Sequence, residues 1–124
     1  LLPAIRDAIV ERSPSGIMFG DGIRLAGLEL LAKHHIQEGM PLCLDIMDIE
    51  RWGKNRRIMD CLKALQYYGG AAKPLLPRLA ELEKQLQNHR EAKMLQPHVE
   101  LLRKIVAAIN ADKNPPKLVR IADR

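Results

Sequence analysis

Residues 57–86 read RIMDCLKALQYYGGAAKPLLPRLAELEKQL, and this stretch decides the fold. Its apolar residues recur every three or four positions in two stripes, one from Ile58 to Tyr68 and one from Leu75 to Leu86. This spacing is typical of helices that bury one face. Gly69-Gly70 separates the two stripes, and glycine readily ends a helix. The stretch therefore predicts two helices joined by a glycine turn.

The same helical spacing continues on both sides of this stretch. Further stripes run over residues 2–9, 25–31, 42–49 and 99–109. No segment alternates apolar and polar residues over the length of a strand. Aromatic residues make up only 3% of the chain, whereas β-rich domains usually depend on aromatic and β-branched side chains. We therefore expect an all-α protein with about five or six helices.

Local signals predict where the helices begin and end. Asp21, which follows Gly20, and Asn55, in the turn Trp52-Gly53-Lys54-Asn55, could each cap the N-terminus of a helix. Pro77 should either begin the regular part of its helix or kink it, and Pro97 should lie in the first turn of the final helix. The helical region should end at Asn114, which two prolines follow.

An internal repeat relates successive parts of the helical region. Arg24 and Arg57 each open an apolar stripe, and Pro41 and Pro74 each open the next one, both at an offset of 33 residues. A helical hairpin of this length cannot bury both of its apolar faces alone, so stacked neighbours are needed to complete a core. The offset predicts a stack of helical hairpins, whereas the stripes alone would equally suit a closed bundle of four or five helices.

An arginine at the start of one helix, a small-residue turn and a Pro-Leu-Leu-Pro helix make this unit resemble the HEAT repeats, including the short bacterial kind. The resemblance extends over about residues 1–86 and is best for residues 57–86. It implies a short right-handed α-α superhelix of the HEAT/ARM type. We expect one domain over residues 1–124, and its parts are a half repeat and loop at 1–20, repeats at 21–52 and 53–86, a capping helix at 87–112 and a basic tail at 113–124.

The first residues predict that this chain is part of a longer protein. Leu1-Leu2-Pro3 matches Leu75-Leu76-Pro77, which puts the start of the chain inside the second helix of an earlier unit. We expect Leu1, Leu2 and Ile5 to form an exposed half-unit that a preceding helix covers in the parent chain. Nothing in the sequence indicates a compartment.

Composition excludes several classes of protein. The chain has 124 residues, 47% of them apolar, which suits a single domain with a core and excludes bulk disorder. The longest apolar run is the five residues Ile105–Ile109, so no membrane span is expected. Lys and Arg number 20 against 15 Asp and Glu, which gives a modest net charge of +5.

No motif predicts a catalytic residue, a cofactor or a metal ion. The possible metal ligands are His34, His35, His89 and His98. Adjacent histidines on a helix point about 100° apart, and neither an HExxH nor a Cys-x-x-Cys spacing occurs, so we expect a solvated His34 and a buried His35 in a turn. Cys43 and Cys61 lie on apolar stripes and should behave as small hydrophobic residues, and their pairing is left open.

Two other features have structural interpretations. The loop at residues 16–22 lacks the Lys-Ser/Thr of a phosphate-binding loop, and its apolar centre, residues 17–19, should fold over the end of the stack. The carboxylate pairs Asp7/Glu11 and Asp45/Asp48 should form solvated polar faces of helices.

One cluster of charge surrounds the single tryptophan. The candidate partner-binding residues are Arg51, Trp52, Lys54, Arg56 and Arg57. Turns between successive hairpins align along one edge of a stack, so this cluster should lie at an edge. In one interpretation Trp52 is exposed and the cations recognise a partner. In the other, which we favour, Trp52 packs inward against Ile49 and Ile58 and the cations are simply solvated.

The architecture and the absence of a catalytic motif predict a non-enzymatic module for protein–protein interaction or scaffolding, as part of a larger protein. Its partner would be another protein or another domain of the parent chain. The alternative is a HEAT-like domain that binds nucleic acid through a basic surface. Acids are interleaved with the bases and base-stacking aromatics are scarce, so the sequence favours the first function.

Overall fold

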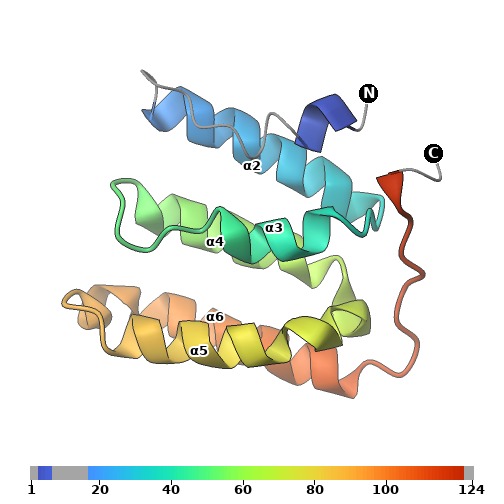
Figure 1. Ribbon diagram of the computed structural model, residues 1–124. Helices are drawn as coiled ribbons and strands as arrows, with labels where there is room; N and C mark the ends of the chain where they lie inside the picture. Colours follow the sequence, from blue (N-terminus) through green and yellow to red (C-terminus); the bar gives the residue numbers. More distant parts are fainter. Residues whose placement is uncertain (1–2, 7–16, 122–124) are drawn as a thin grey trace.

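The computed structural model describes residues 3–6 and 17–121, and this part of the chain is entirely helical apart from its connections and one isolated bridge (Figure 1). Residues 3–6 are helical. The named elements are α2 (Ile17–Lys33), α3 (Gly39–Asp45), α4 (Lys54–Gln66), the 3₁₀ helix η1 (Gly69–Leu75), α5 (Leu76–Gln87) and α6 (Ala92–Ala111). The prediction of an all-α protein with five or six helices is confirmed.

The helices lie in layers, one above another. In Figure 1, α2 is uppermost, α3 and α4 form the middle layer, and α5 and α6 form the lowest one, with α3 and α5 in front of α4 and α6. Helix α4 packs along α3 within the middle layer, against α2 above it and against α6 below it, while α6 also packs along α5. Successive layers therefore each cover an apolar face of the layer before.

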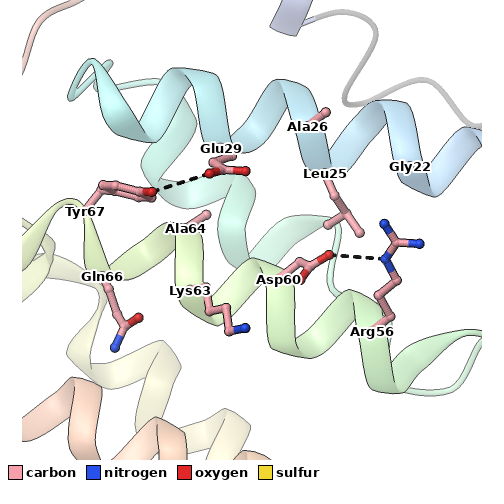
Figure 2. A pocket seen from close by; sticks show the side chains of 10 residues that line it. All are labelled: Gly22, Leu25, Ala26, Glu29, Arg56, Asp60, Lys63, Ala64, Gln66 and Tyr67. Atoms are coloured by element: carbon pink, nitrogen blue, oxygen red, sulfur yellow. Dashed lines mark hydrogen bonds and ion pairs between the residues drawn. The ribbon is translucent and has the colours of Figure 1, made fainter.

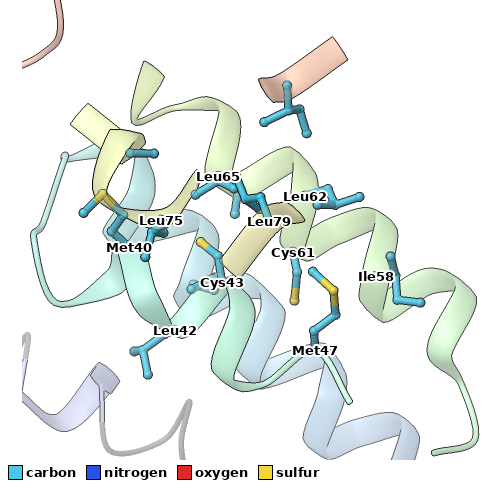
Figure 3. Packing of buried hydrophobic residues seen from close by; sticks show 14 of the residues in the cluster. Met40, Leu42, Cys43, Met47, Ile58, Cys61, Leu62, Leu65, Leu75 and Leu79 are labelled. Carbon is cyan, nitrogen blue, oxygen red and sulfur yellow. The ribbon is translucent and has the colours of Figure 1, made fainter. Parts of the chain in front are cut away.

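One continuous core joins the layers, and it is almost wholly aliphatic. Figure 3 shows its centre, where Met47, Ile58 and Cys61 pack with leucines from α3, α4 and α5. Burying one such aliphatic side chain stabilises the fold by roughly 1.5–3 kcal/mol. Cys43 and Cys61 lie fully inside this core, as small hydrophobic residues do, and no disulfide joins them.

Several helix ends differ from the sequence prediction. Asp21 lies inside α2 and is therefore not its cap. The glycines on either side of it weaken a helix, but they do not end this one. Helix α4 begins at Lys54, and its N-cap is Gly53, in the left-handed conformation with φ of 81°, so Asn55 is not the cap. Pro97 lies within α6 instead of in its first turn. Its side chain is exposed.

Two other predicted ends are confirmed. The regular helix α5 begins at Leu76, directly before Pro77, and Pro74 lies in the preceding 3₁₀ turn. Helix α6 ends at Ala111, three residues before Asn114.

The segment after α6 is packed along the stack. From Asp112 it runs in an extended path along the edge of the layers to the turn between α2 and α3 (Figure 1). There the N–H of Val119 donates to the carbonyl of His35 at 2.9 Å, and the N–H of Gln37 donates to the carbonyl of Val119 at 2.6 Å. Leu118 and Ile121, like Val119, are half-buried against the core. The sequence predicted only a basic tail here.

Some expectations fall outside the described residues. They concern Leu1, Leu2, Asp7, Glu11 and the side chains of residues 17–19. Ile5 is described, and it is half-buried against the core.

Candidate partner-binding site

Arg57 is buried, which corrects the prediction that it is a partner-binding residue. Its side chain is 1% exposed. Nε donates to the carbonyl of Met47 at 2.7 Å, and the two terminal nitrogens donate to the carbonyls of Asp48, Arg51 and Trp52. A guanidinium has a rigid fork of donors, so one side chain can bind four carbonyls of the same loop. Arg57 therefore holds the loop between α3 and α4 together and is not accessible to a partner.

Trp52 lies on the loop that Arg57 holds. Its side chain is 64% exposed, so the inward packing that we favoured from the sequence is wrong. Ile58 is fully buried in the core, and Ile49 is half-buried against it. The indole is therefore not buried against these two isoleucines.

The three remaining cations of the cluster each pair with an acid. Arg51 contacts Asp48 at 3.7 Å and Arg56 contacts Asp60 at 3.5 Å. Lys54 reaches across to Glu91 in the turn between α5 and α6, at 2.8 Å. This hydrogen bond holds the pKa of the Glu91 carboxyl below its usual value. The contact joins two turns that are distant in the sequence.

A second link between the same two turns involves His89, whose side chain is 2% exposed. Its Nδ1 accepts the N–H of Glu91 at 2.9 Å, so the ring proton of the neutral form lies on Nε2, which faces Glu50 at 3.0 Å. Arg90 approaches the same carboxylate at 3.9 Å. We call this surface, residues 49–54 and 88–91, the Trp52 edge. The sequence analysis considered His89 only as a metal ligand and did not bring it together with Glu50 and Arg90, because no spacing links residues some forty positions apart.

The Trp52 edge contains a shallow groove of about 390 Å³. Its lining comes from both turns and from the end of α5, and it comprises Ile49, Glu50, Gln85, Asn88, His89 and Arg90. The groove offers an apolar side chain and charges of both signs, a composition suited to a peptide or protein surface.

A larger groove of about 530 Å³ lies between α2 and α4 (Figure 2). Small side chains, among them Ala26 and Ala64, leave it open, and charged side chains line it. Arg56 and its partner Asp60 lie at one end, and at the other the hydroxyl of Tyr67 donates to Glu29 at 3.4 Å. Glu29 also pairs with Lys33 at 3.2 Å. The acids in this groove are therefore neutralised by neighbours.

The histidines and cysteines are dispersed. His34 is exposed, as expected, and His35 is a half-buried turn residue with φ of 53°. His98 is buried between α4 and α6, with Nε2 at 3.3 Å from Oδ1 of Asn55. Burial raises the pKa of the Cys43 thiol well above its usual value, which disfavours the reactive thiolate. Among the described residues, no three His, Cys, Asp or Glu side chains are grouped so as to hold a metal ion.

Within residues 3–6 and 17–121, none of the helices combines the length and apolarity that crossing a bilayer requires. Comparisons of the chain with protein-family models, with curated proteins and with solved structures found no match.

Proposed function

We propose that this chain is a non-enzymatic protein-interaction module built from HEAT-like repeats. The 33-residue offset supports the repeat. Arg24 and Arg57 are equivalent by that offset, and both are buried. Asp45 and Arg78, also 33 residues apart, form an ion pair of 2.7 Å between α3 and α5, the front helices of successive layers.

The observation that carries the proposal is an exposed tryptophan on a fixed loop. Trp52 is 64% exposed, and Arg57 binds four carbonyls of the loop that presents it. A partner that covers the indole gains a large apolar contact area, and a loop that is already ordered loses little conformational entropy on binding. Tryptophan and arginine are also the residue types enriched at the energetic centres of protein interfaces.

Charge favours a protein partner over nucleic acid. The cations of the Trp52 edge pair with Asp48 and Glu91, and Glu50 is 62% exposed between them. Nucleic-acid surfaces need cations that are free to neutralise phosphates, and single-strand binders need several stacking aromatics. The partner that suits this edge is a protein segment with an apolar pocket for Trp52, in another protein or in another domain of the parent chain.

Selection from a displayed library of random peptides tests this function. The full chain is the bait, and the affinity of each selected peptide is then measured for the chain and for two variants. We expect Trp52→Ala to weaken binding by about 30-fold, since loss of an interface tryptophan typically costs about 2 kcal/mol or more. Leu30→Ala removes another exposed apolar side chain, on α2, and should leave the affinities unchanged.

Two outcomes would overturn the proposal. In the first, the selected peptides bind Trp52→Ala as tightly as the unaltered chain. In the second, no peptide is selected and the chain instead binds duplex DNA at about 50 mM salt, with an affinity that falls steeply as salt rises, which is the behaviour of a nucleic-acid-binding domain.

A further inference from the structure

The segment after α6 binds the stack at an edge opposite the Trp52 edge (Figure 1). Its start is fixed by Asp112, whose carboxylate accepts the N–H of Gly70 at 2.7 Å and the N–H of Asn114 at 2.9 Å. Space is tight here, because a Cβ at Gly69, where φ is +49°, would lie 2.6 Å from the Asp112 carboxylate. Beyond Pro115 and Pro116, the segment binds the turn between α2 and α3.

The contacts at that turn follow the hydrogen-bond pattern of adjacent parallel strands over a single bridge. Val119 pairs with Ile36 in a parallel bridge, donating to the carbonyl of His35 and accepting from the N–H of Gln37. The N–H of Ile121 then donates to the carboxylate of Glu38 at 3.1 Å. Main-chain bonds of this kind supply affinity in β-augmentation, and the apolar side chains between them supply selectivity.

The turn has this shape because of bonds to its own neighbours. The N–H of Ile36 donates to the carbonyl of Leu31 at 2.9 Å, and the N–H of Gly39 donates to the carbonyl of Ile36 at 3.0 Å. The hydroxyl of the buried Tyr68 donates to that same carbonyl at 2.7 Å. The carbonyl of Ile36 is thereby directed inward, and its two neighbours, His35 and Gln37, present an acceptor and a donor at the surface. None of these bonds requires the segment after α6.

We propose that the turn at residues 35–38 is a binding site for an extended peptide with aliphatic residues in the pattern Leu-Val-x-Ile, and that the matching segment of a second copy of this chain exchanges with the chain's own. Every copy carries the segment Leu118–Ile121, so an exchanged segment makes the same contacts as the original. Residues 113–116 separate it from Asp112 and include two prolines, which favour an extended linker. This site is independent of the Trp52 edge.

Nuclear magnetic resonance on the unaltered chain tests the exchange. The chain is labelled with ¹⁵N, and an unlabelled peptide of residues 114–121 is added in excess. The chain's own Val119 amide should lose at least about ten-fold of its protection from hydrogen exchange, because its segment leaves the turn. The amide of Gln37 should keep its protection, because the incoming peptide supplies the same carbonyl. A peptide with Val119→Asp is the matched control and should change neither amide.

Two results would overturn the site. In the first, both amides keep their protection at about millimolar peptide, the concentration at which the peptide competes with a tethered segment. In the second, both amides lose their protection, which means that the segment is displaced and the turn stays empty.

Sedimentation of the full chain tests whether the segment exchanges between two copies. We expect dimers to form as the chain approaches about 1 mM, and to be absent for the variant Val119→Asp. A chain that remains monomeric at that concentration would overturn exchange between copies.

Discussion

Arg57 shows how one side chain can order a loop that lacks regular structure. The loop between α3 and α4 has carbonyls that no helix or strand bonds, and four of them converge on one guanidinium. Buried polar groups left without a partner each cost about 1–3 kcal/mol. The arginine donors and the loop carbonyls therefore complete one another's hydrogen bonds. Removing the arginine leaves several carbonyls without a donor at once.

Arg57→Ala should lower the free energy of unfolding by about 2–4 kcal/mol, because it leaves these carbonyls without their donor. Arg57→Lys keeps the charge but loses the planar fork, so we expect a loss between that of alanine and zero. Arg56→Ala is the control, since Arg56 is 74% exposed and its pair with Asp60 should contribute less than about 1 kcal/mol. Urea denaturation of the three variants measures all of these values. Equal losses for Arg56→Ala and Arg57→Ala would contradict the assignment.

Gly39 allows the first turn of α3 to approach α2 and the side chain of Tyr68 closely. A Cβ at this position would lie 2.5 Å from the Tyr68 hydroxyl and 2.9 Å from Cβ of Leu31. Gly39→Ala should therefore destabilise the protein by about 1–3 kcal/mol, as overpacking does. Gly22, in α2, has nothing within 4 Å of such a Cβ, so Gly22→Ala should stabilise by about 0.5–1 kcal/mol through helix propensity. Thermal unfolding of both variants measures the contrast, and shifts of the same sign would be inconsistent with it.

At the scale of elements, the contact between α4 and α6 includes a buried histidine. Burial lowers the pKa of His98 below its ordinary value of 6.5. Well above pH 6.5 the ring is neutral in both the folded and the unfolded chain. As the pH falls below 6.5, the unfolded chain takes up the proton more readily, so the protein loses stability until the pH has fallen below the pKa of the folded state.

We expect the free energy of unfolding to be lower at pH 5 than at pH 7.5, and His98→Gln to reduce this difference. His34→Gln makes the same replacement on an exposed side chain and is the matched control. Urea denaturation at the two pH values measures it. If His98→Gln and the unaltered chain lose the same stability between pH 7.5 and pH 5, protonation of the buried His98 is not the source of the loss, and the prediction is wrong.

Helices were predictable from the sequence where packing and periodicity agree. The stripe in α4 gives its core residues correctly, since Ile58, Cys61 and Leu65 are fully buried. The start of α6 was not predictable, because Pro97 was taken as a marker of the first turn, yet the helix begins at Ala92. A proline on an exposed helix face costs one hydrogen bond, and tertiary packing along α5 outweighs that cost.

The candidate site was predictable in its location and not in its geometry. Alternating turns must align in a stack, so Trp52 at an edge follows from the order of the helices. The arrangement of side chains within the loop does not follow from the sequence. Arg56 and Arg57 are adjacent in the sequence, yet Arg56 is solvated and Arg57 is buried. One signal was present for the segment after α6, where Leu118-Val119 and Ile121 interrupt the basic tail with aliphatic residues.

At the scale of the whole molecule, one core and one strap join the first layer to the last. Leu28 in α2 and Leu102 in α6 are both fully buried in the same cluster, and the segment from Asp112 to Ile121 links the end of α6 to the turn after α2. We therefore expect a single cooperative unfolding transition. In urea, the methyl signals of these two leucines and the far-ultraviolet circular dichroism should share one midpoint. Separate midpoints would indicate layers that unfold independently, as in long repeat arrays.

The position of the single tryptophan also determines what the intrinsic fluorescence of this molecule can measure. Trp52 is 64% exposed in the folded chain, so we expect its fluorescence to have the long emission wavelength of an indole in water before the chain unfolds. Unfolding should therefore move the emission maximum very little, although the same measurement follows denaturation well in proteins with a buried indole. A bound partner that covers the ring should shift the emission to shorter wavelength. The intrinsic fluorescence of this chain is thus expected to be nearly silent to unfolding and responsive to occupancy of the Trp52 edge.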